Sequence, residues 1–255
     1  MSRRKFAFLV CLLLLAPLAA LAQQQEPSTF TDVAEWTIPR AQWAEYEAFN
    51  KKNVQPVLEK LLADGTIISW GLYTTMVHQE DRETHGTWFE ATSVANLEKA
   101  LAELIKTPNP IINGPGIKHH DIMLRSPTRR SRAGAGSNGY LWVSSSQVQP
   151  GKGQDWRELF DKYTKPIYDE LVANGTISAY WLDVEYVHTD NPGWRGVANL
   201  APNADAIDKV RAAFDAAAQK RGADANRGIG QSFADVTVAG AHRDYAARVI
   251  SYGQK

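Results

Sequence analysis

Residues 52–78 read KNVQPVLEKLLADGTIISWGLYTTMVH, and residues 162–188 read KYTKPIYDELVANGTISAYWLDVEYVH. The two stretches align without a gap at an offset of 110 residues, and the same register continues on both sides over about 75 residues. Self-similarity at a fixed offset indicates a repeated structural unit. The sequence therefore predicts two copies of one unit of about 110 residues.

Each copy is predicted to run strand, helix, strand, strand, helix, strand. Apolar residues at helical spacings indicate the helices, and runs rich in apolar and aromatic residues indicate the strands. Pro56 and Pro166 fall inside the first helix of each copy, so we expect a kink or a fresh helix at each proline. Gly65 and Gly175 should end that helix in the left-handed conformation. The strands are expected at 31–38, 66–78, 87–92 and 121–124, and at 140–148, 176–188, 194–200 and 235–238.

This order of elements is that of the ferredoxin-like split unit, in which an antiparallel sheet carries two helices on one face. The strand predicted at 66–78 is apolar on both faces, whereas a sheet with one solvated face alternates apolar and polar residues. The open face must therefore be covered, and the other copy is the simplest cover. The predicted fold class is α+β, with two tandem ferredoxin-like units pairing sheet to sheet.

The stretch PVLEKLLADGTIISWGL and its second copy PIYDELVANGTISAYWL make the chain resemble the dimeric α/β-barrel superfamily. The resemblance is to the NIPSNAP-type and antibiotic-biosynthesis-monooxygenase-type branches. It implies a pseudo-dimeric α/β barrel with both halves in one chain. The superfamily includes cofactor-free monooxygenases, haem-binding enzymes, isomerases and plain binding proteins, and a shared fold does not choose among them.

Residues 1–22 have the pattern of a secretory signal peptide: a basic head, an apolar centre, and the small-residue exit Ala20-Leu21-Ala22. The apolar run of about 16 residues is short for a membrane span, which needs about 20, and Pro17 interrupts it. We expect cleavage after Ala22 and a periplasmic or secreted protein. The Arg3-Arg4 pair also resembles a twin-arginine signal, although the Leu-rich centre is more typical of a Sec signal.

The expected domains are the first repeat at 23–126, a linker at 127–139 and the second repeat at 140–255. Residues 126–139 read SPTRRSRAGAGSNG, which predicts a solvated linker, with anion binding by its arginines as the less favoured alternative. The only cysteine, Cys11, lies in the signal, so no disulfide is expected.

The formal net charge is zero, so the sequence predicts no nucleic-acid partner. No second apolar stretch is long enough to span a membrane, so no membrane contact is expected once the signal is removed. Both a monomeric pseudo-dimer and a homo-oligomer fit the pattern.

Six residues are candidate ligand contacts: His78, His188, Trp70, Tyr180, Tyr186 and Met76. Alternation along the second strand of each copy places them on one face. If that face lines the space between the sheets, each half offers an aromatic pocket with an imidazole at its rim. An imidazole there could orient a carbonyl, act as a base or ligate haem iron. The favoured alternative is that each histidine closes its strand by hydrogen bonding to the next loop.

Three further features are weaker signals. His78, His85 and the His119-His120 pair could converge on a metal, but no recognised ligand spacing is present, so no metal is predicted. Asp183 and Glu185 occur only in the second copy and predict either salt links to helix arginines or a polar pocket. The glycine stretches at 113–116 and 227–230 lack a phosphate-loop context and are predicted to be turns.

The predicted function is an exported protein that binds, or also oxidises or isomerises, a small apolar or aromatic molecule in a barrel pocket. Whether the chain is an enzyme stays open, and no cofactor is predicted. One alternative is a non-catalytic structural or interaction protein whose barrel is filled by side chains, with Trp70 and Tyr180 as plugs. The other alternative is a haem-binding protein. Because the copies differ in their histidines and carboxylates, we expect any function to be asymmetric.

Overall fold

The computed structural model describes residues 27–80, 82–188 and 192–255. The predicted signal peptide and its cleavage site lie outside the described residues. The first half of the chain forms β1 (Thr29–Thr37), α1 (Trp43–Phe49), α2 (Gln55–Asp64), β2 (Ser69–Thr75), β3 (His85–Ala91), α3 (Val94–Leu104) and β4 (Lys118–Ser131). The second half forms β5 (Gly134–Gln147), α4 (Gly153–Leu159), α5 (Lys165–Ala173), β6 (Ala179–Glu185), β7 (Trp194–Ala201), α6 (Ala204–Arg221), α7 (Ala223–Val236) and β8 (Arg243–Gln254).

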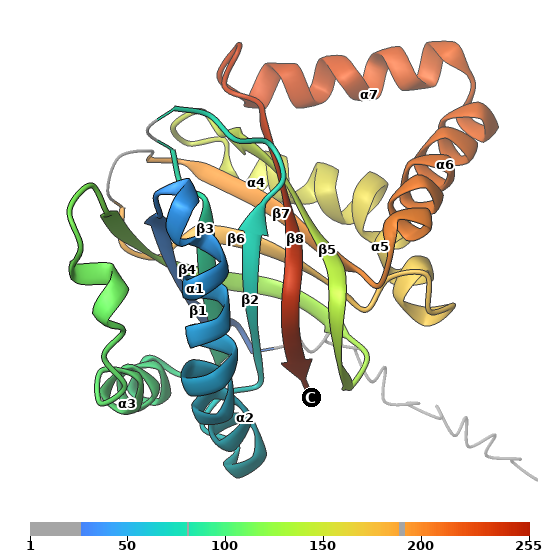
Figure 1. Ribbon diagram of the computed structural model, residues 1–255. Helices are drawn as coiled ribbons and strands as arrows, with labels where there is room; N and C mark the ends of the chain where they lie inside the picture. Colours follow the sequence, from blue (N-terminus) through green and yellow to red (C-terminus); the bar gives the residue numbers. More distant parts are fainter. Residues whose placement is uncertain (1–26, 81, 189–191) are drawn as a thin grey trace, which may run out of the picture.

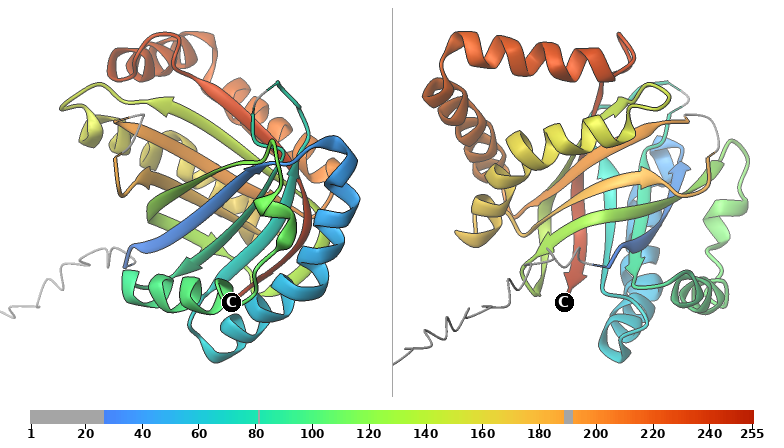
Figure 2. Two further views of the ribbon diagram at one scale, coloured as in Figure 1. Left: turned by 60° about the vertical axis from the view of Figure 1, so that its left-hand side comes forward. Right: turned by 180° about the vertical axis from the view of Figure 1, so that it is seen from behind.

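The strands form one closed antiparallel barrel in the order β1-β3-β2-β8-β5-β7-β6-β4. Strands of the first half lie together, as do those of the second, and the pairs β2–β8 and β4–β6 join the halves. Helices α1 to α3 cover one side of the barrel and α4 to α6 the other (Figure 1, Figure 2). The predicted α+β class with an antiparallel sheet is confirmed.

The helix irregularities predicted from the prolines are present in both halves. A π-helical turn at Asn50–Val54 leads into α2, and an equivalent turn at Phe160–Thr164 leads into α5. Pro56 and Pro166 lie in the first turn of α2 and α5, directly after these π-helical turns. A left-handed glycine follows each helix, with φ of 83° at Gly65 and 79° at Gly175, as predicted.

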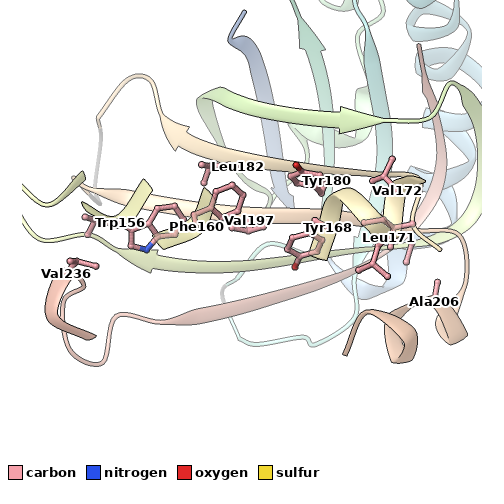
Figure 3. Close-up of a cluster of buried hydrophobic side chains, with 13 residues drawn as sticks. Trp156, Phe160, Tyr168, Leu171, Val172, Tyr180, Leu182, Val197, Ala206 and Val236 are labelled. Atoms are coloured by element: carbon pink, nitrogen blue, oxygen red, sulfur yellow. The ribbon is translucent and has the colours of Figure 1, made fainter. Parts of the chain in front are cut away.

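The apolar side chains form separate cores on the two faces of the barrel wall. Between helices and wall, one core of the first half contains Leu58, Trp70 and Phe89, and that of the second half contains Phe160 and Tyr180 (Figure 3). A third core fills the barrel interior: Tyr73, Trp88, Ala179, Trp181, Ala198, Leu200, Ala247, Val249 and Tyr252. The sheet therefore buries apolar residues on both faces, as its sequence predicts.

Two tryptophans occupy the interior from different strands of the two halves. Gly71 pairs with Trp88 across β2 and β3, and a Cβ at Gly71 would lie 2.0 Å from the Trp88 ring. At the equivalent pair in the second half the sizes are reversed, with Trp181 opposite Ala198. Each half thus contributes one indole and one small residue, which fits both rings into a narrow barrel.

The prediction of a solvated linker at 127–139 is wrong, because most of this stretch belongs to β4 and β5. The end of β4 pairs with β6, and the start of β5 pairs with β8. Its glycines serve close packing: a Cβ at Gly136 would lie 2.7 Å from the Tyr252 ring. Glycine content therefore indicated flexibility where the structure requires the absence of a side chain.

The predictions of a turn at 227–230 and a strand at 235–238 are also wrong. Both stretches fall in or beside α7, and the last strand, β8, begins at Arg243. Gly228 and Gly230 disfavour a helix, but Phe233 packs against Trp156 and Val236 is buried, which anchors the end of α7. Within the described ranges, no helix is long and apolar enough to cross a membrane.

Candidate functional site

The six predicted contacts do not come together. Trp70 and Tyr180 lie on the outer face of the barrel wall beneath the helices, with 2% and 0% of their surface exposed. Met76 and Tyr186 are exposed, as are both histidines that follow the strands. The expectation that their shared face lines the barrel interior is therefore wrong, because helices cover that face. Their role as ligand contacts stays a prediction.

The histidines of the first half have protein partners. His85 is fully buried, and burial together with nearby His78 lowers its pKa to about 4. His119 stacks on Trp36 at 3.6 Å between ring centroids, and His120 Nε2 lies 3.1 Å from a Glu35 carboxylate oxygen. In the part of the chain that the structure describes, no cluster of three or more His, Cys, Asp or Glu side chains could hold a metal.

The carboxylates unique to the second half face the barrel interior instead of helix arginines. Asp183 accepts a hydrogen bond from Ser126 Oγ, and burial, with a smaller contribution from Glu90, raises its pKa to about 7. Glu185 is buried on the same side of β6. The predicted salt links to helix arginines are therefore wrong.

A third interior carboxyl group, that of Glu90, joins the two halves. Its side chain is fully buried. Its oxygens accept hydrogen bonds from four side chains on four other strands: Thr29 Oγ1, Ser69 Oγ at 2.8 Å, Arg129 Nε at 2.9 Å and Trp181 Nε1 at 3.1 Å. A buried carboxyl group with these hydrogen bonds fixes the positions of the strands, and its oxygens are already occupied by protein donors.

Asp183→Asn is expected to change how stability depends on pH. The folded-state pKa of about 7 exceeds the unfolded value near 3.8, so wild type loses stability as pH rises from about 4 to 7. Asparagine removes this loss and keeps an acceptor for Ser126. The variant should gain stability relative to wild type between pH 5 and pH 8 in urea unfolding. His85 and Asp32 titrate in both proteins, so their contributions to the difference in stability cancel. If the variant and wild type differ in stability by the same amount at pH 5 and at pH 8, the raised pKa does not belong to Asp183.

A hollow of about 420 Å³ opens outside the barrel, between α4 and the outer face of β4, β6 and β7. Its size is that of a small-molecule site. Its apolar wall includes Trp156 and Leu182, both labelled in Figure 3. The lining residues are Pro27, Ser28, Arg125, Pro127, Gly153, Gln154, Trp156, Arg157, Leu182, Val184 and Arg195.

Three arginines make the hollow electropositive. Arg157 Nε lies 2.7 Å from an Asp161 carboxylate oxygen, but Arg125 and Arg195 form no ion pair with any residue of the described ranges. Arg195 Nη1 donates to the Trp194 carbonyl at 2.8 Å. Its burial, and then the like charge of Arg125, hold its pKa below the usual range. A half-buried and an exposed guanidinium group therefore line the hollow with no counter-charge from the described residues.

The region of the first half that corresponds to the hollow is filled by the chain itself. We call these two equivalent regions the corners of the two halves. The Trp43 and Tyr46 rings lie edge-on to the His85 ring, at 5.2 Å and 5.0 Å between centroids. Glu47 Oε1 lies 3.3 Å from His85 Nε2. An indole, a phenol and a carboxyl group thus surround the buried imidazole and leave it with no exposed surface.

The two corners differ at positions related by the offset of 110. Where the first half has an indole, the second has no side chain, and where it has a carboxylate, the second has a guanidinium. The pairs are Trp43 and Gly153, Glu47 and Arg157, His85 and Arg195, and Tyr46 and Trp156. These substitutions open and charge the second corner. Sequence reasoning missed the hollow, although departures from the repeat at these positions could have revealed it.

Comparison with known proteins identifies the fold. No protein-family model and no curated protein sequence matches the chain. Among solved structures, a protein from Fusobacterium nucleatum assigned as a monooxygenase is similar at TM-score 0.64 and 10% identity, over 90% of this chain and 96% of that one. A protein from Lactobacillus acidophilus with the same assignment is similar at TM-score 0.62 and 10% identity, over 89% of this chain and 96% of that one.

A protein assigned as a chlorite dismutase is more distant, at TM-score 0.51 and 12% identity, over 88% of this chain and 95% of that one. At such identities the likeness concerns the fold and not the chemistry. The solved structures and the eight-stranded barrel agree with the resemblance drawn from the repeated stretch. The chain shares its fold with these solved structures.

Proposed function

We propose that this protein binds a small organic anion in the hollow formed by Arg125, Arg157 and Arg195. The observation that carries the proposal is that three guanidinium groups line a hollow of about 420 Å³, while among the described residues a single carboxylate, that of Asp161, is paired with them. Like charges in a partly desolvated wall are unfavourable until an anion neutralises them. Guanidinium groups match carboxylates through paired, charge-assisted hydrogen bonds.

The site proposed here lies outside the barrel wall, whereas the sequence led us to expect a pocket between the sheets. The interior holds the large side chains of Tyr73, Trp88 and Trp181, so little space remains there. A small-molecule function agrees with the fold shared with proteins assigned as monooxygenases. It also agrees with the expected asymmetry, since the hollow exists in the second half and its counterpart is closed.

Arg195→Gln is expected to weaken binding of benzoate at least tenfold, because it removes a charged donor pair from the partly buried wall. Isothermal titration calorimetry in low salt measures the affinity. Raising the salt concentration should weaken binding to wild type, since ions screen exposed charges such as Arg125.

Arg248→Gln is the matched control for this measurement. Arg248 lies opposite Thr74 in the first half, at the register position that Arg125 occupies opposite Val184 in the second. It does not line the hollow, so its loss should leave the affinity unchanged. Equal affinities of wild type and Arg195→Gln for benzoate would refute the site.

The haem alternative does not fit the hollow. Its lining residues include no histidine, cysteine, methionine or tyrosine, the side chains that ligate haem iron in proteins. The counterpart corner has His85, but its ring is enclosed by Trp43, Tyr46 and Glu47. A Soret band in the absorption of protein purified from its native host would overturn this conclusion.

We further propose that the chain is exported and that its two halves derive from a tandem duplication. The first rests on the signal pattern of residues 1–22, and the second on the gapless offset of 110. Mass spectrometry of the protein from its native host should find a chain beginning at Gln23. A mature chain that retains Met1 would refute cleavage after Ala22.

A further inference from the structure

The closed corner of the first half indicates what the open corner of the second half takes up. In the first half, the chain places an indole and a carboxyl group against the residue at position 85. Trp43 holds its ring there by donating Nε1–H to the Ile38 carbonyl at 2.8 Å, and Glu47 Oε1 approaches His85 Nε2 to 3.3 Å. The corner is thus filled by one aromatic ring and one acidic group.

The second half lacks both of these groups at the equivalent positions. Gly153 stands where Trp43 would be, and a Cβ built on it lies 3.4 Å from Arg195 Nη2. A side chain at this position would therefore begin beside the Arg195 guanidinium. Arg157 replaces the carboxylate by a cation. Compared with the first corner, the second lacks an indole ring and a carboxylate, and it has guanidinium groups that can bind a carboxylate.

The remaining walls suit a planar ring. Trp156 lines the hollow and is held in place by stacking on Phe160, at 5.7 Å between centroids and 7° between planes. Leu182 and Val184 of β6 also line the hollow, although both side chains are largely buried. Aromatic side chains favour aromatic ligands in offset or edge-on contact.

Resting on the proposed anion site, we infer that its ligand is an aromatic carboxylic acid. Its ring fills the space left by the missing side chain at Gly153, and its carboxylate binds Arg195 together with Arg125 or Arg157. An inorganic anion would satisfy the charges but would leave empty the space that corresponds to the Trp43 ring of the first half. The ligand therefore provides the second corner with the aromatic ring and the carboxylate that Trp43 and Glu47 provide in the first.

Titration of the full chain with indole-3-acetate, acetate and indole tests this inference. Indole-3-acetate should bind at least tenfold more tightly than either of the others, because it alone supplies both ring and charge. If acetate and indole-3-acetate bind wild type equally, the inference is wrong while the proposed anion site stands. If no anion binds and Arg195→Gln changes nothing, both are wrong.

Gly153→Trp should close the corner as Trp43 closes the first one. We expect at least a tenfold loss of affinity for indole-3-acetate. Gly153→Ala is the matched control, because its methyl group makes an ordinary contact at 3.4 Å and should change the affinity less than threefold. Unchanged binding to a folded Gly153→Trp protein would overturn the inference. Should that variant fail to fold, the comparison of the three ligands on wild type decides the matter.

Discussion

Replacing Glu90 by alanine is expected to lower the free energy of unfolding by about 3–5 kcal/mol, because it leaves a buried cation without its partner. The Arg129 guanidinium is 17% exposed and pairs with the fully buried Glu90 carboxyl group. The same change leaves the Ser69 hydroxyl and the Trp181 indole N–H without their acceptor inside the barrel. Each such orphaned donor adds a desolvation cost.

Urea unfolding monitored by circular dichroism measures this loss. Glu90→Gln should be less damaging, because its amide oxygen still accepts hydrogen bonds within the same volume. Glu59→Ala is the matched control: Glu59 is exposed on α2 and accepts a single side-chain bond, from Gln55. Its removal should change stability by less than about 0.5 kcal/mol. Similar losses for Glu59→Ala and Glu90→Ala would show that the interior network contributes nothing specific.

Gly71→Ala is expected to cost about 1–3 kcal/mol through overpacking, despite adding a single methyl group. The added Cβ would lie 2.0 Å from the Trp88 ring, well inside contact distance, and that ring is held in the barrel interior. The neighbouring strands leave it no free direction, since the interior is shared with Trp181 and Tyr73. The substitution is therefore damaging at this position and would be mild on an exposed strand.

A double-mutant cycle isolates the clash. Trp88→Ala alone should cost about 3–5 kcal/mol through the cavity it creates. In that background Gly71→Ala should be close to neutral, because the ring it would strike is gone. The coupling between the two changes should therefore be about as large as the cost of Gly71→Ala in wild type. Additive losses would show that the methyl group strains the backbone and not the Trp88 ring.

The sequence predicted most of the fold because the repeat supplied each signal twice. A helix restart at Pro56 or a left-handed stop at Gly65 is a weak indication alone, but recurrence 110 residues later made both credible. Predictions failed where a residue type was interpreted from local propensity alone. The glycines of 134–139 suggest a linker and those of 227–230 a turn, yet the structure places them in β5 and in α7.

The site was harder to predict, because strand alternation defines two faces and does not say which one meets the helices. Trp70 and Tyr180 were correctly grouped with the same face as Leu72 and Leu182, but that face is the outer one. The arginines of the hollow come from β4, α4 and β7, and only the closed barrel brings these elements together. Their convergence could not be inferred from spacing along the chain.

The chain runs directly from β4 into β5, so both halves of the barrel belong to one polypeptide, and this affects how the protein can evolve. A homodimer encoded by one gene changes both of its equivalent sites with every mutation, so neither can specialise alone. In a single chain each half has its own codons, so position 153 can be a glycine while position 43 is a tryptophan. One half is then free to acquire a new specificity, while the other retains the packing that keeps the molecule folded.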